Sequence, residues 1–423
     1  MHHLDHPPRP LRTLATGLIL AILAPLCAAA QAPDPAWTHR FGGDGNEQVF
    51  DLAVGRDGRA YLAGVTDGRL ERPVTGFFDL VVHAVDADGV PLWTRQIDLG
   101  EFEFPYAVAL APDGDLIVAG TADGEVDGPS AGGDDAFVLR LAPDGSERWR
   151  IALGSEGRDQ ALAAAVASDG TILVGGRSDG GLTGTAAGGD DAFLIALDPD
   201  GRERWRRGIA SDGDDAVRVL EPMRDGGILA GLQSSGSLGA PNPGGIDSYL
   251  RAYDTEGQVA RTASLHAPED LRVFGAVERE DGAWIVVGAG PEGADDGADV
   301  PVFARAITPD GEVAWSATLG PARRDLEHDV AIATDGTIVV TASTEADVAG
   351  TNAGVVDALL TGLTPDGQVA WTVRLGSPRF DAAAAVAAGP DGVRVAGHAS
   401  GGLPGGEPDD DFDGDGWLWR YRF

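Results

Sequence analysis

The fold is decided by one stretch of the chain, residues 149–204, which reads WRIALGSEGRDQALAAAVASDGTILVGGRSDGGLTGTAAGGDDAFLIALDPDGRER. Short apolar runs alternate in it with turns rich in Gly and Asp, a pattern typical of β-strands. The rest of the chain repeats this unit, mostly at a spacing of 56 residues. The spacing is marked by tryptophans, with Arg261 where a further one is expected: Trp37, Trp93, Trp149, Trp205, Trp315 and Trp371.

Two further residue series keep the same register. An Asp-Gly step precedes an apolar run at Asp57, Asp113, Asp169, Asp225, Asp281, Asp335 and Asp391. An Asp opens the last apolar run of each repeat at Asp79, Asp135, Asp191, Asp247, Asp299, Asp357 and Asp415. Both series count seven members. Sevenfold repetition of short strands predicts a radial all-β architecture and not a helical solenoid.

One repeat predicts four strands. Residues 163–167 are small and apolar, which suits an inner strand near a crowded axis, and Asp169-Gly170 forms a tight turn because Gly accepts a positive φ. Residues 171–174, 192–197 and 204–209 follow as the second, third and fourth strands. Hairpin connections between them give a four-stranded antiparallel blade.

The whole chain then predicts a seven-bladed β-propeller over residues 36–423. The repeats run near 37–92, 93–148, 149–204, 205–260, 261–314, 315–370 and 371–423. Residues 37–42 match a fourth strand, while residues 417–423 match a third strand. We therefore expect the N-terminal strand to complete the last blade and close the ring, which leaves only short outer edges.

These motifs resemble the bacterial seven-bladed propeller repeat known as the SBBP repeat. The signature is carried by Leu153-Gly154, Ala165-Val166-Ala167, Asp169-Gly170-Thr171-Ile172, Gly176 and Gly189-Asp190-Asp191-Ala192-Phe193. The chain is also similar to delta-60 repeats, which share the Asp-Gly-x-Ile-x-Val-x-Gly core. The resemblance covers residues 37–423 and implies an exported propeller, while it implies little about activity.

The N-terminus has the features of a secretory signal peptide. Arg9 and Arg12 precede an apolar stretch at residues 14–26, and small residues follow it. We expect residues 1–30 to be removed, with residues 31–35 as a short linker and no membrane span in the mature protein. An uncleaved anchor and a lipoprotein attached through Cys27 are the alternatives, although the stretch is short for a span of about 20 residues.

The charge balance limits the partners. Asp and Glu total 67 against 31 Lys and Arg, which gives a net charge of −36. Nucleic acids and anionic membranes need a basic surface, so both are excluded as partners. The excess suits solubility, cation binding or a basic partner. Cys27 is the one cysteine, so we expect no disulfide in the mature chain.

No catalytic motif stands out. The mature chain has His39, His83, His266, His328 and His398, all in different repeats and none at metal-ligand spacing with another, and it has no nucleophile elbow or phosphate loop. The repeated tryptophans are interpreted as packing between blades. The strand-opening aspartates either form a ring of ligands or, as we prefer, accept backbone N–H groups.

The sequence therefore predicts a non-catalytic binding or cell-surface module, exported and monomeric. The alternative is a secreted lyase or hydrolase that uses acidic residues on the face carrying the long loops. Loops on a rigid scaffold usually carry binding, so we expect a protein or glycan to bind the loops at 121–134 and 177–190. Their Gly and Asp content can equally serve solubility alone.

Residues 409–416 contain a candidate calcium loop. Asp411, Asp413 and Asp415 alternate and Gly416 follows, so a curled loop can turn the carboxylates toward a hard cation such as Ca²⁺. The twelfth loop position is Arg422 in place of Glu, so this is not an EF-hand. The alternative is an acidic surface loop before the last strand.

Overall fold

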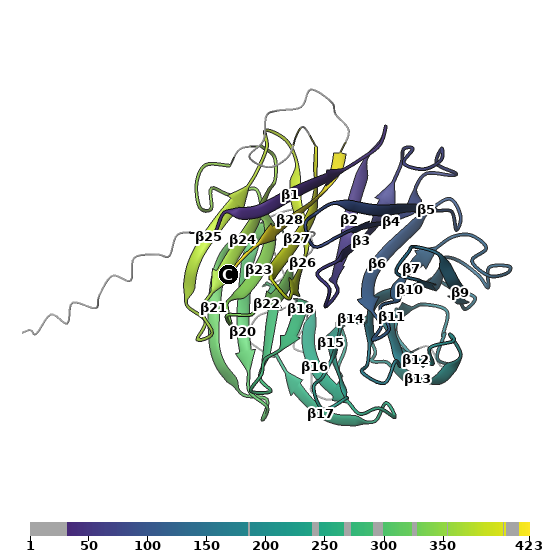
Figure 1. Cartoon of the computed structure of the whole chain (residues 1–423). Coiled ribbons are helices and arrows are strands. Elements are labelled where there is room, and N and C mark those ends of the chain that lie inside the picture. Colours follow the sequence, from purple (N-terminus) through teal and green to yellow (C-terminus); the bar gives the residue numbers. More distant parts are fainter. Residues whose placement is uncertain are drawn as a thin grey trace, which may run out of the picture.

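The computed structural model describes residues 32–184, 187–238, 245–265, 272–290, 299–323, 328–352, 354–400, 402 and 414–423. In these ranges the chain forms β-strands and no helix. The strands group into seven antiparallel sheets of four strands each, arranged in a ring (Figure 1). The protein is a seven-bladed β-propeller, as the repeats predicted. No helix in the described residues could span a membrane.

Each blade runs from an inner strand to an outer strand in chain order. Blade 1 contains β2 (Glu47–Val54), β3 (Ala60–Thr66), β4 (Asp79–Val85) and β5 (Pro91–Ile97); blade 2 contains β6 (Glu103–Leu110), β7 (Leu116–Ala122), β8 (Asp135–Leu141) and β9 (Glu147–Leu153). Blade 3 contains β10 (Asp159–Val166), β11 (Ile172–Ser178), β12 (Asp191–Leu197) and β13 (Glu203–Ile209). Blade 4 contains β14 (Asp215–Pro222), β15 (Ile228–Ser234), β16 (Asp247–Tyr253) and β17 (Val259–Ser264).

The remaining blades follow the same order, except the last. Blade 5 contains β18 (Arg272–Glu278), β19 (Trp284–Ala289), β20 (Asp299–Ile307) and β21 (Val313–Arg323), and blade 6 contains β22 (Asp329–Ile332), β23 (Ile338–Thr344), β24 (Asp357–Leu363) and β25 (Val369–Leu375). Blade 7 contains β26 (Asp381–Gly389), β27 (Gly392–Ser400), β28 (Gly414–Tyr421) and, as its outer strand, β1 (Pro35–Phe41).

The ring is closed by strands from the two ends of the chain. β1 pairs antiparallel with β28, placing Thr38 opposite Trp419 and Phe41 opposite Gly416. Figure 1 shows β1 lying along β28, beside strands from the other end of the sequence. This confirms the predicted closure, which covers an edge that would otherwise expose unpaired backbone groups.

The Asp-Gly steps form the turns between the first and second strands of the blades. All seven glycines have a φ between 78° and 129°: Gly58, Gly114, Gly170, Gly226, Gly282, Gly336 and Gly392. The Asp carboxylate stabilises the turn, as where Asp169 accepts the N–H of Thr171 at 2.9 Å. The tight turns therefore lie on one face of the ring. The longer second-to-third-strand loops and the crossings between blades lie on the opposite face, called here the long-loop face.

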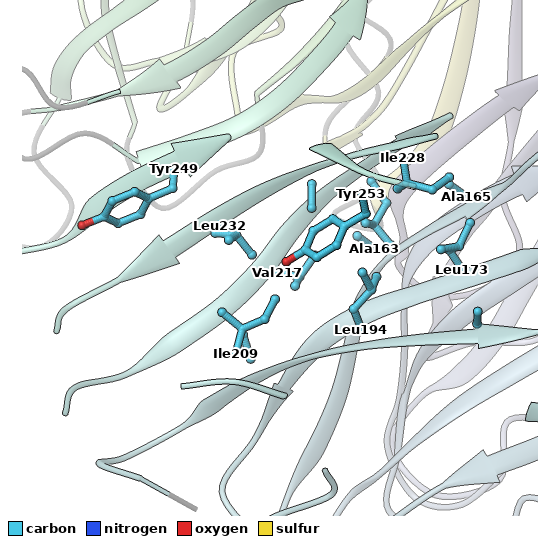
Figure 2. Close-up of a cluster of buried hydrophobic side chains, with 14 of the residues drawn as sticks. Ala163, Ala165, Leu173, Leu194, Ile209, Val217, Ile228, Leu232, Tyr249 and Tyr253 are labelled. Carbon is cyan, nitrogen blue, oxygen red and sulfur yellow. The ribbon is translucent and has the colours of Figure 1, made fainter. Parts of the chain in front are cut away.

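The core lies between neighbouring blades. At the interface of blades 3 and 4, Ala163 and Leu194 pack in one apolar cluster with Val217, Leu232 and Tyr249, all with at most 5% exposure (Figure 2). Small residues such as Ala163 on the inner strand let the blades approach near the axis. As close packing maximises dispersion and apolar burial, these clusters stabilise the ring without a disulfide.

Candidate functional site

The inner strands of all seven blades surround an axial cavity of about 330 Å³. Most of its wall is Ala, Val and Leu, but Asp51, Glu221 and Asp329 contribute carboxylates from three different blades. Tyr106 and His328 also line it. Asp51 and Asp329 occupy the same inner-strand position in two blades, but the other blades carry no acid there and Glu221 lies at a different position, so the channel wall is not sevenfold symmetric.

Asp51 and Asp329 join neighbouring blades. Asp51 accepts the backbone N–H of Val108 in blade 2 at 2.6 Å, and Asp329 accepts the backbone N–H of Val386 in blade 7 at 2.9 Å. Each also accepts the N–H of the next residue in its own strand at 2.7 Å. Their carboxylates therefore contribute to blade docking at the two places where the inner strand carries an acid at this position.

Glu221 differs from these two acids because no hydrogen bond to its carboxyl group is found among the described residues. Burial raises the pKa of Glu221 to about 8, and the nearby charges of Asp329 and Asp51 add to the increase. The Glu221 carboxyl group therefore holds a proton more readily near neutral pH than an ordinary glutamate does. A carboxylic acid of raised pKa beside other carboxyl groups is an arrangement that general acid catalysis uses.

A second non-repeated feature lies on the long-loop face of blades 1 and 2. Six aromatic side chains gather there, called here the aromatic patch: Phe50, Phe77, Phe78, Phe102, Phe104 and Tyr106. Phe77 and Phe102 stack nearly parallel with ring centroids 4.7 Å apart, and they are 58% and 38% exposed. Phe50 and Tyr106 also line the axial cavity, so the patch leads from the surface to the channel.

The backbone holds the exposed rings in place. The N–H groups of Phe77 and Phe78 donate to the carbonyl oxygen of Glu101, at 2.9 and 3.3 Å. The N–H of Phe102 donates to the Asp123 carboxylate at 3.0 Å. The loop before β4 and the crossing from blade 1 to blade 2 are thus tied together, and the patch is formed where they meet.

This patch was not predicted from the sequence, although the sequence contains a signal for it. Phe77 and Phe78 occupy positions that are Gly and Asp in the next two repeats, as in Gly133-Asp134. Two aromatic residues at positions that are Gly and Asp in the following repeats are a departure from the repeat, and this departure is the signal. The predicted binding loops at 121–134 and 177–190 lie in blades 2 and 3, whereas the exposed aromatics come from blade 1 and from the crossing that follows it.

The strand-opening aspartates have a structural role where the structure describes their contacts. Asp79, Asp135 and Asp191 each accept the backbone N–H of the residue four positions earlier, at 3.2, 2.8 and 2.9 Å. Asp357 forms an ion pair with Arg374 at 2.6 Å. The interpretation that these carboxylates fix the loop exit therefore agrees with the geometry.

A second acidic series was missed by the sequence analysis although it keeps the same spacing. Its members open inner strands, are at most 1% exposed, and each accepts the backbone N–H four residues earlier: Glu47, Glu103, Asp159, Asp215 and Asp381. Burial raises the pKa of all five, to about 7 for Glu47, about 8 for Glu103 and about 7 for Asp381. Each also lies near a strand-opening Asp of the preceding blade, whose charge raises its pKa further.

Two histidines form a close pair that was not expected. His39 and His83 both fall within the predicted repeat 37–92, and not in different repeats as expected. The structure places them in neighbouring blades, on β1 of blade 7 and β4 of blade 1, where their Nε2 atoms are 2.9 Å apart and their rings are stacked. Ring closure brings them together, which spacing along the chain could not reveal. Burial lowers the pKa of His83 to about 3, and the proximity of His39 contributes. Burial also lowers the pKa of His39, so both rings hold a proton less readily than a free histidine.

The candidate calcium loop falls only partly within the described residues. Asp411 and Asp413 lie outside them. Asp415 lies on β28 and forms an ion pair with Arg40 of β1. A Ca²⁺ ion that used Asp415 would compete with this arginine, and the calcium site stays a prediction.

Comparisons with known proteins identify the fold but no family. No protein-family profile matches the chain. The regulatory protein FlaEY of Caulobacter vibrioides is 34% identical over 173 residues, a match that covers 36% of this chain and 18% of FlaEY. The chain thus spans less than a fifth of the length of this curated relative.

The solved structures that this chain resembles are distant from it in sequence. A protein of unknown function from Dyadobacter fermentans is 11% identical, with 92% of this chain and 99% of that chain covered and a TM-score of 0.52. The WD40 domain of Neurospora crassa Pan2 is 12% identical, with 89% of each chain covered and a TM-score of 0.47. An α-L-arabinanase from Penicillium chrysogenum is 14% identical, with 75% and 93% covered and a TM-score of 0.46. At these identities the likeness concerns the fold alone.

Proposed function

We propose that this protein is an exported, non-catalytic binding module of the SBBP repeat type, whose contact surface is the long-loop face of blades 1 and 2. The aromatic patch is the observation that carries the proposal. Exposed large apolar residues that cluster on a charged surface are typical of interaction sites. Its position on loops of a rigid ring fits the way such scaffolds usually bind their partners.

The proposal extends to localisation and family through the sequence. The basic and apolar N-terminal segment supports export, with cleavage after Ala30. The repeat signature, present in all seven blades with local departures, supports the SBBP assignment. Mass spectrometry of the protein recovered from outside the cytoplasm should give a chain that begins at Gln31, whereas a chain retaining residues 1–30 would contradict cleavage.

Binding is tested by removing the aromatic surface. We expect the wild-type protein to bind members of an array of peptides and glycans, and the variant Phe77→Ser with Phe102→Ser to lose those signals. The matched control is Val313→Ser with Val369→Ser, which removes exposed apolar groups from outer strands, where both residues are about half exposed. Signals that both variants retain would overturn the proposed surface.

A second candidate function is a hydrolase that uses the channel. Glu221 favours it, since an acid of raised pKa near Asp51 and Asp329 could act as a general acid, with one of these two carboxyl groups as its partner. The backbone N–H groups bound by these two aspartates argue for a structural role instead. A panel of nitrophenyl glycosides, tested on wild type and Glu221→Gln, distinguishes the two: activity lost in the variant supports catalysis.

A further inference from the structure

We infer that the aromatic patch binds a basic polypeptide segment, one that presents an aromatic or aliphatic side chain flanked by Lys or Arg. The inference rests on the proposed function and names the chemistry of the partner.

The exposed rings are positioned before any partner arrives. Phe77 and Phe102 lie 10° from parallel, and the hydrogen bonds to the Glu101 carbonyl and the Asp123 carboxylate hold the backbone of both. A partner side chain would therefore meet a formed surface. Preorganisation of this kind reduces the entropy lost on binding, so a small patch can still contribute useful affinity.

Beneath the exposed rings lies a second aromatic layer. The rings of Phe78 and Phe104 are 5.8 Å apart, and Phe78 also contacts Phe102 at a centroid distance of 6.3 Å. Both inner rings are partly exposed. A single aromatic or aliphatic side chain of the partner would thus find apolar atoms beside and below it, as anchor residues of protein interfaces do.

The patch is bordered by acids. Asp98 and Glu101 are exposed on the crossing that carries Phe102, and Asp123 is half-buried against it. Two arginines lie close to this border. Arg72 already pairs with Asp79 at 3.3 Å and lies 4.0 Å from Asp98, and Arg150, which pairs with Glu147, also interacts with the charge of Asp98. The border is therefore negative around an apolar centre, and the whole chain carries a net charge of −36.

This combination selects among partner classes. A phosphate backbone or an anionic lipid would be repelled by the border and by the net charge. A neutral glycan could stack on the rings but would gain nothing from the acids. A basic segment gains from both, since apolar contact supplies the anchor while complementary charge speeds association and favours the correct partner.

The test starts from a random-peptide phage library selected on the wild-type protein and depleted on the Phe77→Ser, Phe102→Ser variant. We expect the surviving peptides to combine an aromatic or aliphatic residue with several Lys or Arg. Calorimetry with one such synthetic peptide should show an affinity at least about tenfold lower for the Phe77→Ser, Phe102→Ser variant than for the wild type. Charge neutralisation by Asp98→Asn with Glu101→Gln should weaken binding by several fold, and added salt should do the same to the wild type.

Controls separate the possible failures. Val313→Ser with Val369→Ser and the exposed-turn variant Glu256→Gln should leave the affinity unchanged, and matched melting temperatures show that each variant is folded. Peptides that depend on the patch but are neutral or acidic, or glycans that depend on it, overturn the basic partner while leaving the proposed function intact. Failure to recover any patch-dependent peptide or glycan overturns both.

Discussion

The indole N–H of Trp149 donates to the carbonyl oxygen of Pro199 at 3.1 Å, a bond that spans fifty residues and joins two blades. The same bond, at 3.0 to 3.3 Å and with the same separation, is made by Trp37, Trp93, Trp205 and Trp315. Each ring also lies against the Gly of the outer hairpin in the next blade, as Trp149 does at Gly201. The repeated tryptophan is therefore half-buried and joins its blade to the next one.

Two positions of this series depart from the pattern in an informative way. Arg261 stands at the Trp position of blade 4, and its guanidinium lies 3.8 Å from the ring centroid of Trp284, which is fully buried in blade 5. An aromatic contact therefore also joins blades 4 and 5, but here the ring belongs to Trp284 of the following blade. Trp371 stacks on Phe423 at the chain end, with centroids 5.8 Å apart.

We predict that Trp149→Ala lowers the free energy of unfolding by about 2–3 kcal/mol. A fully buried aromatic residue would cost about 3–5 kcal/mol, and the smaller value follows from the partial exposure of the ring. Trp149→Phe keeps most of the apolar contact and removes the N–H donor, so it should cost about 1 kcal/mol. Denaturant titration measures both; equal losses for the two variants would show that the ring contact contributes little.

Ring closure should control the stability of the whole molecule. Deleting residues 36–43 removes β1, uncovers the edge of β28 and breaks the ion pair of Arg40 with Asp415. We expect the melting temperature to fall by more than about 10 °C. A single substitution, Thr38→Pro, should lower it in the same direction, since Pro restricts the backbone of a residue that lies within the paired part of β1, opposite Trp419. An unchanged melting temperature for the deletion would contradict closure by β1.

Stability should fall as the pH rises from 6.5 to 8. Burial, together with the charge of Asp79, raises the pKa of Glu103 to about 8, so the folded state keeps a proton there that the unfolded state has already released. Stability linked to this group is complete at low pH and is lost as the pH rises through the folded pKa. Glu47 and Asp381 act in the same direction, up to about pH 7.

The histidines act in the opposite direction and at lower pH. Burial lowers the pKa of His83 to about 3 and that of His398 to about 4, so they reduce stability as the pH falls below 6.5. Above that value the carboxyl groups dominate. Glu103→Gln should therefore reduce the slope with which the free energy of unfolding falls as the pH rises, by up to about 1.4 kcal/mol per pH unit. Glu256→Gln, in an exposed turn, should leave this slope unchanged. Chemical denaturation at several pH values decides between these outcomes.

Calcium should stabilise the protein if the loop before β28 binds it. We expect millimolar Ca²⁺ to raise the melting temperature and the variant Asp411→Ala with Asp413→Ala to abolish the increase. An ion there would support the strand that pairs with β1, and hard oxygen ligands favour Ca²⁺. Calorimetry without any heat of binding, or an increase that persists in the variant, would rule the site out.

Much of the fold could be predicted because it depends on short-range sequence patterns. The positive φ of Gly170 requires Gly in the tight turn, and the period of the Trp and Asp series sets the size of a blade. The inner strand β10 begins at Asp159, earlier than the predicted residue 163, and Asp159 pairs there with Ser178 of β11. The Asp159 carboxylate is buried and accepts the N–H of Ser155 at 2.6 Å, a contact that the polarity of an Asp does not predict.

The sequence by itself determined the blade, the number of blades and the closure, since each depends on local turns and on strand pairing that repeats. Only the tertiary structure decided which residues meet across the ring. It brought His39 to His83, placed Glu221 near Asp51 and Asp329, and gathered Phe77 and Phe102 into one surface. Those contacts join residues from different blades, and their geometry depends on how the ring curves and packs, which no local pattern in the sequence encodes.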